Sequence, residues 1–239
     1  MVSVDTVYQR VLALANKEQR GYITPQEFNL LANQAQMVIF EQYFYDLNKF
    51  LIDPGMDTMH ADIVDILEEK ISIFERSDTL TLTTNTGSLN SLNRFYRLSN
   101  VRRNNLILES VSRKDFRMFP NSPLAAPTAT RPIYIVDTVN NTIQVAGRTF
   151  ATLDIDYIAS PTRANWGYVI TLGEAMYNPS APDAQDFELH ASEETLLVLK
   201  ILELAGLVLN KVGLVQTAGA EEAEMITQQK LKQQPQQTR

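Results

Sequence analysis

The spacing of apolar residues changes twice along the chain. In four stretches apolar positions recur every three or four residues, which predicts amphipathic helices over residues 3–19, 25–48, 59–73 and 188–209. From residue 79 to 158 apolar and polar residues alternate instead, which predicts about five or six β-strands. The order of helices, strands and helices predicts an α+β fold.

In the fold expected from this order, the N- and C-terminal helices form one bundle and a small antiparallel β domain is inserted between them. The N-terminal helices are expected at residues 1–78 and the β domain at residues 79–173. The C-terminal helix is expected at residues 174–218 and a C-terminal arm at residues 219–239. Prolines predict a loop over residues 160–186, and a last helix is predicted over residues 218–230. The glutamine-rich arm is expected to stay partly disordered until it docks.

The start of the second helix carries the clearest local signal. Thr24 and Glu27 have the spacing of a capping box, in which each side chain bonds the backbone amide of the other residue. Pro25 falls at the first helical position, where a missing N–H costs nothing. Apolar residues follow two sides of this helix, which predicts that it is buried centrally or contacts a neighbouring subunit.

Composition excludes several kinds of chemistry. The 239 residues include no cysteine and two histidines, so thiol nucleophiles, thiolate zinc sites and disulfides are excluded, and a site with several histidines is not expected. Neither a glycine-rich phosphate loop nor a Gly-x-Ser-x-Gly elbow occurs. No apolar run approaches the ~20 residues that cross a bilayer. We therefore expect no enzyme activity, no cofactor, no metal and no membrane partner.

Two acidic clusters contain residue types that bind metals. One consists of Asp53, Asp57, His60, Asp62 and Asp65. It lacks the alternating Asp/Asn–Gly loop of a calcium hand, so a solvated acidic helix start is the favoured interpretation. The other places His190 before Glu193 and Glu194, and a surface helix start is favoured there too.

The charges of the chain, which sum to −7, are unevenly placed. Residues 53–78 and 174–203 each carry a net charge of −6, whereas residues 94–131 carry +6. Opposite signs favour association between copies, although three solvated faces would show the same pattern. The candidate interface or DNA-facing residues are Arg94, Arg97, Arg102, Arg103, Arg113 and Lys114. The alternative is an edge strand whose arginine stems cover apolar surface.

Four parts of the chain together resemble a known family. They are residues 21–29, residues 95–98 with 107–116, residues 131–134 with 156–161, and residues 188–194 with 200–206. In this layout the chain resembles the head-to-tail connector proteins (adaptor, ring or tail tubular A-type) of short-tailed bacteriophages, crAss-like phages included. The layout covers nearly the whole chain, and none of the four parts is a catalytic signature.

The resemblance implies a structural, non-enzymatic virion protein. Copies would form a twelvefold ring under the portal, in the neck of the virion, after assembly in the host cytoplasm. The ring would extend the DNA channel, lie close to packaged DNA without sequence preference, and carry the next tail or neck protein. In this family a C-terminal segment reaches the portal or a neighbour, which here corresponds to residues 219–239. The alternatives are another neck or tail ring protein further from the portal, and a DNA-binding accessory protein that uses residues 94–103.

Overall fold

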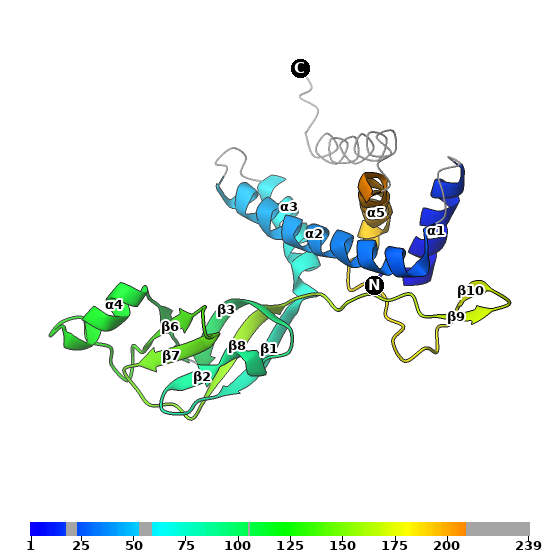
Figure 1. The fold of residues 1–239 in the computed structure, drawn as a ribbon. Coiled ribbons are helices and arrows are strands. Elements are labelled where there is room, and N and C mark those ends of the chain that lie inside the picture. Colours follow the sequence, from blue (N-terminus) through cyan, green and yellow to red (C-terminus); the bar gives the residue numbers. More distant parts are fainter. Residues whose placement is uncertain (18–22, 53–58, 105, 209–239) are drawn as a thin grey trace, which may run out of the picture. The chain divides into compact units, whose positions relative to one another are not determined.

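A computed structural model describes residues 1–17, 23–52, 59–104 and 106–208 (Figure 1). The contacts among these residues divide the chain into two compact units. The first unit combines residues 1–73 with residues 161–208, and the second is the continuous segment 74–160. The helix predicted over residues 218–230 and the C-terminal arm, residues 219–239, lie outside the described residues.

The first unit contains the four predicted helices, and the structure confirms each of them with boundaries that differ by up to six residues. They are α1 (Val4–Lys17), α2 (Pro25–Ile52), α3 (Met59–Ser72) and α5 (Glu194–Val208) (Figure 1). A short 3₁₀ turn, η3 (Ala191–Glu193), precedes α5. The predicted start at residue 188 is therefore early by six residues, because this turn and an extended segment come first.

Helix α5, near the end of the described chain, packs against α1 and α2, which lie near the start of the chain. Helix α3 packs against α2. The buried side chains that join them include Val7, Val11, Phe28, Ile39, Phe40, Leu197 and Ile201. Burial of each large apolar side chain contributes roughly 1.5–3 kcal/mol. Both predicted apolar sides of α2 contribute to this core, with Ile39 on one side and Phe40 on the other, although Leu30 and Tyr45 remain exposed.

The capping box predicted at the start of α2 is present. The Glu27 amide donates to Thr24 Oγ1 at 3.3 Å, and the Thr24 amide donates to Glu27 Oε2 at 3.0 Å. These two bonds satisfy donors that the first helical turn leaves without partners. The hydrogen bonds from Thr24 also hold the pKa of Glu27 below its ordinary value.

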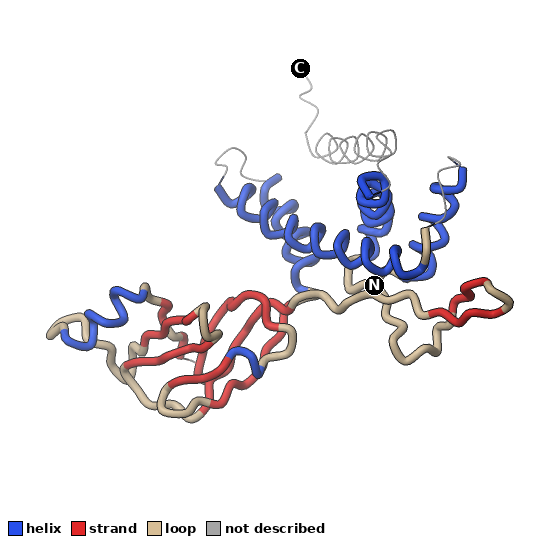
Figure 2. Tube along the Cα trace, viewed as in Figure 1, coloured by secondary structure: helices blue, strands red, loops and turns tan. Residues whose placement is uncertain are grey.

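The second unit contains two four-stranded sheets rather than one sheet of five or six strands (Figure 2). The first has the order β1-β8-β3-β4, and the second has the order β2-β7-β6-β5. The strands are β1 (Glu75–Thr81), β2 (Thr86–Ser88), β3 (Phe95–Arg103), β4 (Leu106–Ile107), β5 (Glu109–Ser110), β6 (Ile133–Asp137), β7 (Thr142–Ala146) and β8 (Thr152–Ala159). The expected all-antiparallel pairing is wrong at one place, because β5 and β6 run parallel.

Strand β8 shows most directly how the sequence builds the second unit. Its side chains alternate strictly, so that Leu153, Ile155 and Tyr157 are buried in the core. The intervening Asp154 and Asp156 lie on the opposite, solvent-facing side of the sheet. The β1-β8-β3 part of the sheet therefore has an apolar inner face and a charged outer face.

Three helical turns joining the strands have no counterpart among the predicted elements. They are η1 (Leu89–Ser91), α4 (Arg113–Met118) and η2 (Phe119–Asn121). None is longer than six residues, and neither α4 nor η2 contains a buried side chain. Apolar periodicity cannot reveal helices that bury nothing.

The predicted loop over residues 160–186 contains a β-hairpin, so this prediction is wrong over its central part. Strand β9 (Tyr168–Thr171) pairs antiparallel with β10 (Glu174–Tyr177), and neither pairs with a further strand of the described chain. We refer to residues 168–177 as the hairpin.

The β unit starts and ends earlier than the segment 79–173 expected from the sequence. Strand β1 begins at Glu75, and residues after 160 are held by α2. Amide side chains one helical turn apart on α2 bind this segment: Asn29 Nδ2 donates to Asn165 Oδ1 at 2.7 Å, and Asn33 Nδ2 donates to the Ala164 carbonyl at 2.8 Å. These polar contacts assign the segment to the first unit.

The capping box generates a stability prediction. Replacing Thr24 with Ala should lower the free energy of unfolding by about 1 kcal/mol, because the Glu27 amide loses its acceptor. Urea denaturation followed by circular dichroism at 222 nm measures this loss. Thr24→Ser, which retains the hydroxyl, serves as the control and should lose much less. Equal stability of the Ala variant and the unmodified protein would contradict the prediction.

Candidate interaction surfaces

All six basic residues predicted as interface or DNA-facing candidates lie in the second unit. They are Arg94, Arg97, Arg102 and Arg103 at β3, and Arg113 and Lys114 at the start of α4. Arg94 is half-buried, and its Nη1 donates to the Ser160 carbonyl oxygen at 2.9 Å. The six residues therefore divide into a group at β3 and a group at α4.

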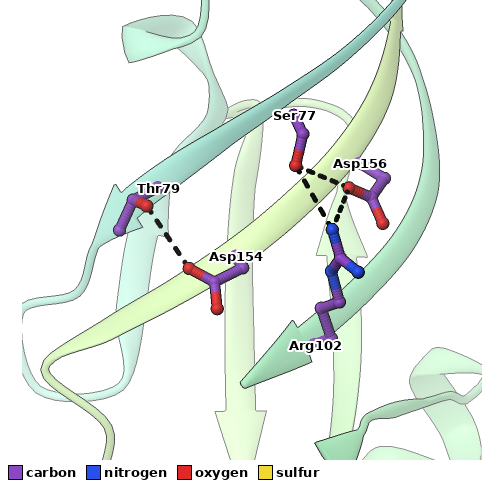
Figure 3. A network of polar contacts seen from close by, with 5 residues as sticks. All are labelled: Ser77, Thr79, Arg102, Asp154 and Asp156. Carbon is purple, nitrogen blue, oxygen red and sulfur yellow. Dashed lines mark hydrogen bonds and ion pairs between the residues drawn. The ribbon is translucent and has the colours of Figure 1, made fainter. Parts of the chain in front are cut away.

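Arg102 is held in a polar network on the outer face of the sheet (Figure 3). Its Nη2 lies 3.0 Å from Asp156 Oδ1 on β8. The hydroxyl of Ser77 on β1 donates to the same carboxylate oxygen at 2.7 Å. Asp156 thus partly neutralises the guanidinium, which weakens the attraction of Arg102 for a nucleic acid phosphate.

Two open hollows border this network, with volumes of about 860 Å³ and about 310 Å³. Threonine and serine hydroxyls make up most of the lining of the larger hollow, and Asp78 borders both. Asp78 accepts a hydrogen bond from the Tyr157 hydroxyl at 2.7 Å. Burial, together with this bond, raises the pKa of Tyr157 to about 12. The hydroxyls of the larger hollow are therefore available as hydrogen-bonding partners beside a carboxylate.

The N-terminal part of α4 is neutralised within the second unit. Arg113 Nη2 lies 2.8 Å from Asp137 Oδ1. A hydrogen bond from Asn140, and then the neighbouring Arg113, hold the pKa of Asp137 below its ordinary value. Arg113 therefore serves local structure, as does Asp115, whose amide donates to the capping Ser112 Oγ at 3.2 Å.

The rest of this region is exposed. Lys114 and Arg117 form no ion pair with any residue that the structure describes. Met118 and Leu124 are exposed apolar side chains, and Leu124 has its full surface in solvent. We refer to residues 113–124 as the α4 segment. It presents two available cations beside two uncovered apolar groups.

The two units carry opposite net charges. Within residues 74–160 there are ten lysines and arginines and seven aspartates and glutamates, a net charge of +3. The described residues of the first unit hold six cations and fifteen anions, a net charge of −9. Surfaces of opposite sign steer molecules together and set their relative orientation.

Exposed apolar side chains are concentrated on the hairpin, whose strands β9 and β10 are labelled in Figure 1. The exposed fractions are 47% for Val169, 72% for Ile170 and 56% for Met176, and Leu172 at the tip is fully exposed. Leu172 and Gly173 have φ values of 55° and 89°, as in a type I′ turn. A left-handed conformation costs an L-residue such as leucine about 1–2 kcal/mol, and asparagine or glycine is preferred at this turn position.

The base of the hairpin is fixed to the first unit. The buried Trp166 ring stacks on Tyr168 and Tyr177 with centroid distances of 5.8 and 5.7 Å. Its indole Nε1 donates to Asp5 Oδ1 on α1 at 2.9 Å. The hairpin is thus held at its base while its tip is uncovered.

The sequence itself contains a signal for the hairpin, which the prediction of a loop does not take into account. Residues 168–171 read Tyr-Val-Ile-Thr, a run with high β propensity, and Gly173 follows in the turn. The flanking prolines at 161, 179 and 182 favoured a loop instead.

The candidate metal clusters have no counterpart among the residues that can be followed in the structure. Among the residues that the structure describes, no group of three or more possible ligands is found. Asp53 and Asp57 lie outside the described residues, and Asp65 is exposed. His190 caps η3, since its Nδ1 accepts from the Ser192 amide at 3.3 Å and lies 2.8 Å from Ser192 Oγ.

Glu193, expected at a surface helix start, is buried instead. Its Oε1 lies 2.6 Å from Lys70 Nζ, so the pair connects α3 to the turn before α5. Lys70 Nζ also lies 5.8 Å from the centroid of the Tyr43 ring. Burial, and then the charge of Glu193, raise the pKa of Tyr43. This arrangement is a structural ion pair inside the helical unit.

Comparison of the sequence with models of known protein families found no match, and comparison with curated proteins found none either. Within the described part of the chain, no helix combines the length and apolar character needed to span a membrane.

The Lys70–Glu193 pair generates a second stability prediction. Lys70→Met should destabilise the protein by about 3–5 kcal/mol, because Glu193 is left buried without a counter-charge. The double variant Lys70→Met/Glu193→Leu should recover most of this loss. Urea denaturation measures the free energy of unfolding of both variants. Lys49→Met, at an exposed position, is the control, and its free energy of unfolding should stay within about 0.5 kcal/mol of that of the unmodified protein. A loss under about 1 kcal/mol in the single variant would show that solvent reaches Glu193.

Tyr157 generates a prediction about alkaline pH. Its folded pKa of about 12 lies above the ordinary value of 10.0, so its contribution to stability is fully present below pH 10. This contribution is lost as the pH rises from 10 through 12. Urea unfolding at pH 9 to 12 should show a falling free energy, and Tyr157→Phe should show a shallower fall. Parallel pH profiles of the two proteins would contradict the raised pKa.

Proposed function

We propose that the protein is a structural subunit of a bacteriophage virion that assembles into a twelvefold head-to-tail connector ring under the portal. The ring extends the DNA channel and carries the next tail or neck component. In this proposal the terminal helices form one bundle and the β unit is inserted into it. The protein acts in the virion neck, after assembly in the host cytoplasm, and performs no catalysis.

The observation that carries the proposal is the opposite net charge of the two units, −9 and +3. A ring forms when two different patches of each subunit meet, so that every copy offers one patch to each neighbour. Units of opposite sign on one chain supply two such patches. The resemblance of the four sequence parts to short-tailed phage connectors supports the same assembly.

Two further observations support a structural rather than a catalytic role. The larger hollow on the β unit is lined mainly by hydroxyl side chains, and the carboxylate of Asp78, which borders both hollows, accepts a hydrogen bond from Tyr157. The exposed Leu30 and Tyr45 of α2 and the exposed hairpin provide apolar surface of the kind that marks protein–protein contacts.

The charge of the chain also suits a DNA channel. A net charge of −7 gives the DNA backbone few uncompensated cations to bind, so the duplex can slide past without adhering. Arg102, from the basic segment, is neutralised by Asp156. A channel-forming role therefore fits these charges better than that of a DNA-binding accessory protein.

Cross-linking mass spectrometry on purified particles, combined with cryo-electron microscopy of the neck, tests the proposal. We expect the protein in mature particles, in one ring per portal vertex and cross-linked to the portal. Washing the particles in high salt provides the control for adsorbed protein. Absence from washed particles would refute the proposal. A ring without portal contact would instead favour a neck protein further from the portal.

An electrophoretic mobility shift assay at low salt tests the accessory-protein alternative. We expect no shift of duplex DNA by the free subunit. A shift that disappears with rising salt and with Arg97→Gln/Arg103→Gln would favour that alternative.

A further inference from the structure

We propose that the hairpin of one copy docks on the α4 segment of a second copy. This contact would join the first unit of one subunit to the second unit of its neighbour. The inference rests on the proposed function, because it names the subunit contact from which the ring is built.

The tip of the hairpin has the properties of a docking element. Four apolar side chains, Val169, Ile170, Leu172 and Met176, are exposed within ten residues. Contiguous exposed apolar surface on a folded protein marks an interaction site. The hairpin carries one charged residue, Glu174, so little desolvation of charge opposes its burial.

Leu172 gives an independent reason to assign a binding role to the tip. Its φ of 55° is unfavourable for a bulky side chain, and no described neighbour covers that side chain. Within the described chain the leucine is therefore strained and buries nothing. Strain of this kind persists at positions where the side chain serves binding.

The rigid base makes the hairpin suitable for docking. Trp166 is buried and stacks on the first and last residues of the hairpin, Tyr168 and Tyr177. The two strands also satisfy each other's inner backbone groups over four residue pairs. Little conformational entropy is then lost when the tip binds, which favours affinity.

Charge and exposed apolar surface identify the partner as the α4 segment of a second copy. The hairpin belongs to the unit of net charge −9, so it approaches a basic surface most readily. On the α4 segment, Lys114 and Arg117 have no ion pair among the described residues and can face Glu174. Met118 and Leu124 provide exposed apolar surface for Leu172.

The proposed contact is heterologous, because two different surfaces meet. Each copy keeps a free hairpin after its α4 segment is occupied, so the contact repeats until the assembly closes. This is the geometry that a ring requires.

Disulfide trapping in full-length protein tests the contact directly, since the chain contains no cysteine. We expect the variant Leu172→Cys/Leu124→Cys to give a ladder of covalent oligomers when assembled material is oxidised. Each single-cysteine variant should give dimers at most, and Leu172→Cys/Leu14→Cys serves as a matched control pair without a ladder. A ladder that ends at a closed species supports a ring.

A second experiment separates docking from folding. Leu172→Gly should leave the unfolding midpoint unchanged or raise it, because glycine adopts a positive φ without strain. The same variant should weaken association in analytical ultracentrifugation by about tenfold or more. Leu14→Ala, at another exposed leucine of the first unit, should associate like the unmodified protein.

Charge reversal tests the orientation of the contact. Glu174→Lys and Lys114→Glu/Arg117→Glu should each weaken association, and combining them should restore it. Loss without restoration would overturn the assigned pairing of these charges.

The outcomes distinguish this inference from the proposed function. A ring in particles without disulfide trapping at 172 and 124 would overturn the inference alone. If the disulfide between residues 172 and 124 forms in solution but the protein is absent from virions, the contact is supported and the virion role is refuted. The protein could instead sediment with phosphatidylcholine–phosphatidylglycerol vesicles in a way that depends on Leu172, while copies do not associate. This result would overturn the inference and identify a lipid surface as the partner of the hairpin.

Discussion

Both ends of the described chain bury one common set of apolar side chains, and the rest of the structure depends on this constraint. Helix α5 packs against α1 and α2, so residues nearly two hundred positions apart share one core. The backbone of Val2 pairs with that of Phe187, and the Val4 amide donates to Asp186 Oδ1 at 2.8 Å. The chain between α3 and residue 160 is thereby left outside this core. It buries its own apolar side chains as a separate unit.

The charges of the protein fall into two groups with different physical roles. Some are compensated within a unit: Lys70 with Glu193 inside the helices, and Arg102 with Asp156 on the sheet. Others, such as Lys114 and Arg117, have no ion pair among the described residues. The uncompensated charges determine how the surface meets other molecules, because compensated charges have little field beyond their partner. Whether a given lysine or arginine is compensated depends on its position in the fold and not on its residue type.

Several elements could be predicted from the sequence because their causes are local. The Thr24–Glu27 capping box places the start of α2, and strict alternation identifies β8 with its buried Ile155 and Tyr157. The hairpin was not predicted, since three flanking prolines outweighed a short β-branched run. The six candidate basic residues are visible in the sequence as one basic segment, but their division into paired and available charges depends on neighbours that only the folded chain supplies.

The sequence by itself determined the helices, most of the strands, the order of the two structural classes and the absence of thiol chemistry, because periodicity and composition are local properties. Only the tertiary structure decided that Glu193 is buried against Lys70, that β5 runs parallel to β6, and that Leu172 stands uncovered at a strained turn. Each of these features depends on contacts between residues distant in the chain, or on their absence. No local pattern of apolar and polar residues encodes such contacts.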